Sequence, residues 1–140
     1  MLRNITESQL CFLVPRLETL VSAAPLDFLS LVPSKLPECA GVYLITAGSI
    51  CEEHPYYVGR TKNLRRRLYT NHLMGPRSNA RLKHHLIGSG ECADLLSAKH
   101  FIRTNCFVRW IEQEGFRERG AIEGYVKAVL FPKHGIDEEH

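Results

Sequence analysis

Residues 41–68 read GVYLITAGSICEEHPYYVGRTKNLRRRL, and this stretch carries the signals that decide the fold. Residues 41–46 are rich in β-branched and aromatic side chains and lie between glycines, so they predict a strand. Residues 56–59 predict a second strand of the same kind. Because residues 47–55 contain Gly, Ser and Pro, we expect the two strands to form an antiparallel hairpin with a long loop.

Helices and one further strand are predicted around this hairpin. Asn63 is a suitable N-cap for a basic helix that holds Leu64 and Leu68 at i, i+4 and ends at residues 75–76, Gly-Pro. Further helices are expected over 7–22, where Thr6 opens a capping box, over 26–32, from 78 or 79 to 87, and near 91–102. Residues 106–111 predict a third strand, and the apolar stripe over 122–130 predicts a final helix that ends before Pro132.

This order of elements predicts an α+β fold with a small sheet, for which three strands would suffice. We expect residues 1–36 to form an N-terminal helical extension of the main domain, which occupies residues 37–140. The 140 residues are 44% hydrophobic and 24% charged, which is typical of one globular domain. No apolar run approaches the roughly 18 residues of a membrane span, and no signal peptide is evident, so we expect a cytoplasmic protein without a membrane partner.

Several common kinds of site are excluded by the sequence. The five cysteines form no C-x-x-C pair, so we expect reduced thiols rather than a disulfide framework or a zinc site. No G-x-x-x-x-G-K-[ST], G-x-S-x-G or H-E-x-x-H motif occurs. His84 and His85 are neighbours on a predicted helix and point about 100° apart, so we expect exposed or phosphate-facing histidines rather than metal ligands.

The net charge of +3 conceals a strongly basic segment, because residues 54–90 contain eight bases and no acids. The bases are Arg60, Lys62, Arg65, Arg66, Arg67, Arg77, Arg81 and Lys83. A block of one sign can bind phosphates or can be the solvated face of a helix, and charge alone does not separate these alternatives.

A group of candidate functional residues surrounds the basic segment. Tyr43 and Tyr57 lie on the two predicted strands, and Glu123 lies on the final helix. Arg60 and Arg67 follow the second strand closely enough for both guanidinium groups to reach one phosphate over the strand end. Because a nearby positive charge favours the ionised form of a tyrosine, we expect a phenolate suited to general-base chemistry.

The sequence resembles the GIY-YIG nuclease superfamily. Residues 41–43, Gly-Val-Tyr, are followed after thirteen residues by 57–59, Tyr-Val-Gly, and the continuation over 57–68 is especially similar to the nuclease domain of UvrC-type excision-repair proteins. Arg67 and then Glu123, nine residues before Pro132, follow in the order of that family. The resemblance covers residues 37–135.

The resemblance implies a three-stranded antiparallel sheet flanked by helices, with residues 37–140 as a GIY-YIG-like nuclease domain. It implies a metal-dependent endonuclease that hydrolyses DNA phosphodiester bonds at a single-metal site. Glu123 would hold Mg²⁺ or Mn²⁺, and Arg67 would bind the scissile phosphate. Tyr43 or Tyr57 would help activate a water molecule, with Arg60 assisting the tyrosine or the phosphate.

The expected partner is double-stranded DNA, and a homodimer would suit paired cuts on the two strands. The residues expected to bind the nucleic acid are Arg60, Lys62, Arg65, Arg66, His72, Arg77, Arg81 and Lys83. The chain departs from the family pattern at Asn71, which is followed by His72, and at Gly135.

These departures motivate an alternative, a catalytically silent nucleic-acid-binding module of the same fold. Another is a protein-interaction domain that acts through its N-terminal helix. Structural explanations of single residues also stay open: Tyr43 and Tyr57 as packed strand aromatics, Glu123 in an ion-pair row with Arg119 and Lys127, and Arg67 as one more solvated base.

Overall fold

A four-stranded antiparallel sheet forms the centre of the structure, with strand order β1-β4-β2-β3. The computed structural model describes residues 1–49, 51–74 and 81–136, apart from the side chains of 71–74. The strands are β1 (Leu26–Asp27), β2 (Gly41–Ser49), β3 (Glu52–Thr61) and β4 (Cys106–Glu112). The helices are α1 (Leu2–Ser22), the 3-10 helix η1 (Pro33–Lys35), the π-helix η2 (Arg66–Met74), α2 (Arg81–Gly88), α3 (Leu95–Asn105) and α4 (Phe116–Leu130).

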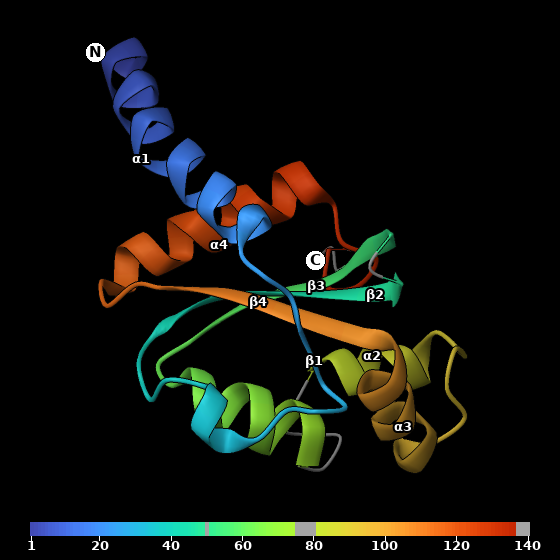
Figure 1. The fold of residues 1–140 in the computed structure, drawn as a ribbon. Helices are drawn as coiled ribbons and strands as arrows, with labels where there is room; N and C mark the ends of the chain where they lie inside the picture. Colours follow the sequence, from blue (N-terminus) through green and yellow to red (C-terminus); the bar gives the residue numbers. More distant parts are fainter. Residues whose placement is uncertain (50, 75–80, 137–140) are drawn as a thin grey trace.

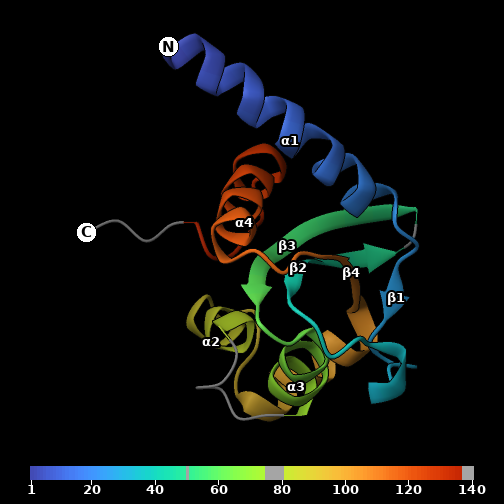
Figure 2. The same cartoon turned by 90° about the vertical axis from the view of Figure 1, so that its left-hand side faces the viewer.

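Helices cover both faces of the sheet, which confirms the predicted α+β fold. Figure 1 shows α1 and α4 on one face and α2 and α3 on the other, and Figure 2 shows these layers from a second direction. The inner strand β2 is buried over residues 41–47, and its side chains alternate between two cores. Val42 and Leu44 pack with α1 and α4, whereas Tyr43 and Ile45 pack with η2, α2 and α3.

The sheet contains four strands rather than the predicted three, because residues 26–27 join its edge. Leu26 pairs with Val108, and Asp27 pairs with Phe107. The prediction of a helix over 26–32 is therefore wrong. Asp27 Oδ1 accepts hydrogen bonds from the backbone N–H and the hydroxyl of Ser30, at 2.7 and 2.9 Å, which stabilise a turn instead. The prediction failed because an apolar segment this short shows no hydrophobic periodicity that distinguishes a helix from a strand.

The hairpin of β2 and β3 is longer than predicted, since most of the expected loop over 47–55 continues the two strands. A bulge follows Ile45, whose partner is Tyr57, because Thr46 pairs with Pro55 and skips one residue of β3. Tyr56 and Tyr57 consequently both pack against the core of η2, α2 and α3. Pro55 is tolerated because β3 is an edge strand.

Side-chain caps set two helix starts. Asn63 Oδ1 accepts the Arg66 backbone N–H at 3.0 Å, as the predicted N-cap requires, and Asp94 caps α3. In contrast, α1 begins at Leu2 rather than at residue 7, and the Thr6 hydroxyl donates to the Leu2 carbonyl inside the helix. The predicted helix end at 75–76 and helix start at 78 or 79 lie outside the described residues.

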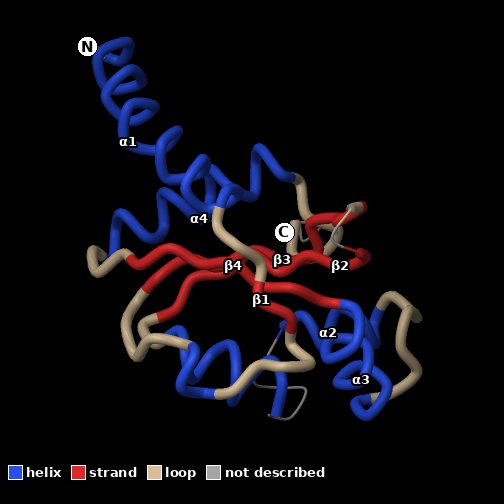
Figure 3. Tube along the Cα trace, viewed as in Figure 1, coloured by secondary structure: helices blue, strands red, loops and turns tan. Residues whose placement is uncertain are grey.

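Helix α1 extends past the sheet at its N-terminal end, as Figure 3 shows. It is 21 residues long, with Pro15 inside it. Over residues 1–49, 51–74 and 81–136, neither α1 nor any other helix combines the length and the apolar character that crossing a membrane requires.

An ion pair between Arg109 of β4 and Glu53 of β3 ties together the strands on either side of β2. The guanidinium donates to both carboxylate oxygens, at 2.7 and 2.9 Å, and the Thr46 hydroxyl donates to the same carboxylate. Arg109 Nε also donates to the Ala23 carbonyl at the end of α1, at 2.9 Å. Only 12% and 14% of the two side chains are exposed. The hydrogen bonds from Arg109 hold the pKa of Glu53 below its usual value.

Glu53→Gln leaves the half-buried guanidinium without its carboxylate, so we expect the free energy of unfolding to fall by about 2 kcal/mol at neutral pH. Because the pKa of Glu53 is lowered in the fold, its contribution is present above the usual carboxyl pKa and is lost as the pH falls through the folded pKa. The difference between the parent and the variant should therefore shrink in acid. Urea unfolding at neutral and acidic pH measures both effects.

The control is Glu38→Gln, which removes an exposed ion pair with Arg65 at 3.1 Å and should cost less than about 1 kcal/mol. Equal losses from the two variants would contradict the role assigned to the pair of Glu53 and Arg109.

Candidate active site

A cavity of about 360 Å³ opens beside β3, the outer strand of the sheet. Its walls come from β2, β3, η2, α2 and α4 and from the segment after α4. The lining residues are Tyr43, Tyr57, Gly59, Arg60, Arg67, Arg81, His85, Glu123, Lys127 and Gly135. The structure therefore brings together the two tyrosines, the arginines and the glutamate that were singled out in the sequence.

Tyr43 reaches the cavity because Gly59 has no side chain. The two residues lie directly opposite each other in the register of β2 and β3. A Cβ atom on Gly59 would overlap the hydroxyl and the ring of Tyr43. The phenol of an inner strand thus crosses the backbone of the outer strand and arrives at the edge of the sheet.

Burial keeps the Tyr43 phenol neutral. The residue is 2% exposed, and its ring centroid lies 6.3 Å from that of Tyr57. Burial raises the pKa of Tyr43 well above its usual value, and Tyr57 and Glu123 add to the rise. The charge of Arg67 acts in the opposite direction and is outweighed. The expectation that nearby cations favour a phenolate is therefore wrong for Tyr43.

Glu123 presents its carboxylate from α4 between two cations. Arg60 Nε lies 3.6 Å from Oε1, and Lys127 Nζ lies 3.8 Å from Oε2. Arg60 reaches across α4 at Gly120, where a Cβ atom would overlap its guanidinium. The sequence suggested an ion-pair row of Arg119, Glu123 and Lys127, and its contact between Glu123 and Lys127 is present. Arg119 is instead buried and donates to backbone carbonyls just before α4.

His85 also lines the cavity, whereas the sequence predicted only that His84 and His85 are exposed or phosphate-facing and assigned neither to the site. The ring centroid of His85 lies 6.3 Å from that of Tyr57 and 5.8 Å from that of His134, against which it stacks. His134 Nε2 lies 2.8 Å from Glu91 Oε1, so a carboxylate holds the second histidine. Arg81 and His85 are four residues apart on α2, and this spacing, which places both on one helix face, was the available signal.

Comparison with known proteins identifies the family. The GIY-YIG catalytic domain matches residues 39–127, more than half of the chain. The chain belongs to the GIY-YIG family. Searches of curated proteins and of solved structures found no match. The matched region begins just before β2 and ends within α4, so it includes Tyr43, Tyr57, Arg67 and Glu123.

One departure from the GIY-YIG pattern has a structural reason. The backbone N–H groups of residues 133 and 134 donate to carbonyls of β3 at 3.0 Å, so the chain after α4 runs along the outer strand. Gly135 has a φ of 91°, and a Cβ atom there would lie 3.3 Å from the Tyr57 ring. A glycine at this position lets the chain pass closely over Tyr57.

The bases of this GIY-YIG domain divide between the cavity and its surroundings. Three bases of the predicted basic segment line the cavity itself, Arg60, Arg67 and Arg81, and Lys127 of α4 joins them. Lys62 and Arg66 are exposed and line an adjoining cavity of about 360 Å³, which shares two arginines with the first. Arg77 and the side chain of His72 lie outside the described residues, as does the side chain of Asn71.

Two other bases are held by the fold. Lys83 is completely buried on α2, so it forms no part of the basic surface, contrary to the prediction. Its burial, together with the charge of Lys99, lowers its pKa to about 8. Arg65 lies outside both cavities, where its Nε donates to the Leu36 carbonyl at 3.0 Å and its Nη1 lies 3.1 Å from Glu38.

Gly59→Ala places a methyl group where the Tyr43 phenol lies, so we expect the free energy of unfolding to fall by about 1–3 kcal/mol. Near-ultraviolet circular dichroism should also change as the tyrosine is displaced. Gly124→Ala is the matched control, because the added methyl meets open space on α4 and alanine is the better helix former. It should stabilise the protein by about 0.5–1 kcal/mol. A Gly59→Ala protein as stable as the parent would refute the close approach.

Proposed function

We propose that this GIY-YIG domain is an endonuclease that hydrolyses phosphodiester bonds of double-stranded DNA with one bound Mg²⁺ or Mn²⁺ ion. The observation that carries the proposal is the meeting of Tyr43, Tyr57, Arg67 and Glu123 in one cavity. These residues come from β2, β3, η2 and α4. Strand aromatics and solvated bases without a shared role would have no reason to converge from four elements.

The cavity is suited to phosphate. Arg60, Arg67 and Arg81 line it, and guanidinium groups match the geometry and charge of phosphate oxygens. In the proposed mechanism Arg67 binds the scissile phosphate and offsets the negative charge that develops in the transition state. Arg60, which lies 3.6 Å from the carboxylate of Glu123, orients that carboxylate and contacts the same phosphate.

Glu123 suits a hard divalent ion whose other ligands are water and phosphate oxygens. Mg²⁺ is commonly bound by one or two carboxylates together with substrate phosphates. No cluster of three or more His, Cys, Asp or Glu side chains able to hold a metal occurs in the described part of the chain, so the substrate would complete the site. The contacts of Glu123 to Arg60 and Lys127 are longer than direct hydrogen bonds, which leaves its oxygens available as ligands. When bound, the ion supplies positive charge that stabilises the leaving 3′ oxygen.

The two tyrosines orient the attacking water, and His85 accepts its proton. Because the pKa of Tyr43 is raised, its hydroxyl serves as a neutral hydrogen-bond donor that orients the water or a phosphate oxygen. Imidazole exchanges protons near neutral pH. His85 lies beside Tyr57 in the cavity, and in the proposed mechanism it accepts the proton of the water that Tyr57 positions.

Glu123→Gln removes the charge that the ion requires, so we expect cleavage to fall at least about 100-fold while DNA binding stays within about threefold of the parent. Nicking of supercoiled plasmid with and without Mg²⁺ or Mn²⁺ measures cleavage, and a gel-shift assay measures binding. Glu118→Gln, an exposed glutamate in the first turn of the same helix, is the control and should cut like the parent.

Metal-independent cutting, or full cutting by Glu123→Gln, would refute the single-metal mechanism. A parent protein that binds plasmid yet leaves it intact under every condition would instead support the silent binding module. The ratio of nicked to linear product reports on paired cuts by a homodimer, in which a two-fold axis places one site on each strand.

His85→Ala removes the proposed proton acceptor, so we expect the cleavage rate to fall by about 100-fold or more. His84→Ala is the matched control, because the neighbouring side chain is exposed and does not line the cavity. Single-turnover cleavage rates are the measurement. A His85→Ala rate close to that of the parent, or an equal loss in His84→Ala, would contradict the assignment.

A further inference from the structure

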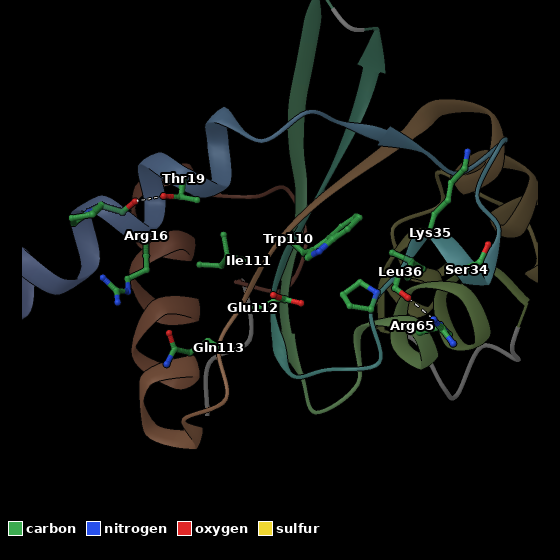
Figure 4. A pocket seen from close by; sticks show the side chains of 12 residues that line it. Arg16, Thr19, Ser34, Lys35, Leu36, Arg65, Trp110, Ile111, Glu112 and Gln113 are labelled. Atoms are coloured by element: carbon green, nitrogen blue, oxygen red, sulfur yellow. Dashed lines mark hydrogen bonds between the residues drawn. The ribbon is translucent and has the colours of Figure 1, made fainter.

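A separate cavity, of about 790 Å³, lies beside the part of β4 that the short strand β1 leaves uncovered. Figure 4 shows Arg16 and Thr19 of α1 on one side of it, Leu36 and Arg65 on the other, and Trp110 between them. Trp110 is the sole tryptophan of the chain. It packs against the core behind it and stays partly exposed to the cavity.

Three bases line the same cavity as this tryptophan. Arg16 and Arg65 are half-buried, and Lys35 is exposed. The lining of the cavity therefore holds three bases and one acid, Glu112, whose carboxylate accepts a hydrogen bond from the Cys39 thiol at 3.0 Å. The bases also have partners within the fold, since Lys35 Nζ donates to the Ser30 carbonyl at 3.3 Å and Arg65 pairs with Glu38. An aromatic ring among cations is the composition that binds a base by stacking and its phosphates by charge.

A row of cavities that share lining residues, most of the charged ones basic, joins this cavity to the candidate active site. Arg65 also lines a smaller cavity together with Asn63, Arg66 and Glu38, the acid with which Arg65 pairs. Asn63 and Arg66 line the next cavity together with Arg60 and Arg67, and these two arginines line the candidate active site. This row of cavities forms a path that passes around one end of the sheet. At this end β2 begins, and its neighbours β3 and β4 both end beside it.

We propose that one DNA strand leaves the active site along this path and that an unpaired base of that strand stacks on Trp110. The bases of the path contact successive phosphates, and the Trp110 cavity binds the base. A base inside a duplex is not available for stacking on a side chain, so the preferred substrate is a duplex with a single-stranded arm beside the cleaved position. This inference rests on the proposed nuclease function.

An extended peptide is the other ligand that this cavity suggests. The Cys106 carbonyl accepts the Phe28 N–H on the outer side of β4, and strand alternation directs the backbone groups of Trp110 and Glu112 to that same side. A peptide could pair with this edge. A bound peptide would not explain why bases line the adjoining cavities from Arg65 to Arg67. We therefore favour a nucleic acid as the ligand.

Fluorescence of Trp110 tests the proposal directly, because no other tryptophan contributes. The full chain, in EDTA to prevent cleavage, is titrated with a blunt duplex and with the same duplex carrying a single-stranded arm of either polarity. We expect the armed duplex of one polarity to quench the fluorescence through stacking and the blunt duplex to leave it nearly unchanged.

Substitutions separate the stacked base from the phosphate contacts. Trp110→Leu should weaken binding of the armed duplex by about 5- to 100-fold, whereas Trp110→Phe, which keeps an aromatic ring, should stay within about threefold of the parent. Lys35→Gln should reduce the slope of log affinity against log salt by about 0.7 for the armed duplex. Arg3→Gln, at the far end of α1, is the control and should leave the slope unchanged.

Equal quenching by blunt and armed duplexes, or unchanged affinity in both Trp110→Leu and Lys35→Gln, would overturn the inference. Cleavage of plasmid and of the armed duplex by the parent is measured in parallel, with Mg²⁺ or Mn²⁺ in place of EDTA. Cleavage without arm-dependent quenching refutes the path alone and leaves the nuclease function standing. Arm-dependent quenching without any cleavage supports the path as a binding surface and refutes the nuclease function.

Discussion

The close approach of Tyr43 to Gly59 is the contact on which the cavity depends. A residue of an inner strand can reach the edge of a sheet only where the outer strand has no side chain in its way, and Gly59 meets that condition. Any larger residue would direct the phenol back toward the core. The pairing of a tyrosine in one strand with a glycine in the next is thus a steric requirement of the site.

The same contact sets the chemistry of the phenol. Tyr43 reaches the cavity from the buried side of the sheet, so it stays desolvated and its pKa rises even though Arg67 is near. Burial outweighs the cation. A neutral hydroxyl can donate a hydrogen bond to water or phosphate, and proton acceptance then falls to a group of a different kind, for which His85 is placed beside Tyr57.

Two surfaces meet at the outer strand to complete the cavity. The tyrosines approach from the face that η2 and α2 cover, whereas Glu123 approaches from α4 on the opposite face. Arg60 links them, because it belongs to β3 and reaches across α4 at Gly120. The half-buried pair of Glu53 and Arg109 keeps α1 and the strands in place behind this arrangement. Bases that continue from the cavity around the end of the sheet extend the positive surface toward Trp110.

The local pattern by itself determined the hairpin, the helices at Asn63 and before Pro132, and the candidate residues, because strand composition, caps and motif spacing act over short distances. Only the tertiary structure decided which bases face the cavity. Lys83 belongs to the basic segment, yet it lies on the buried face of α2. Arg81 and His85 lie on another face of the same helix and line the cavity together with Tyr57. Similarly, residues 26–27 became a strand because β4 offered an edge, and the Tyr43 phenol stayed neutral because burial is a property of the whole fold.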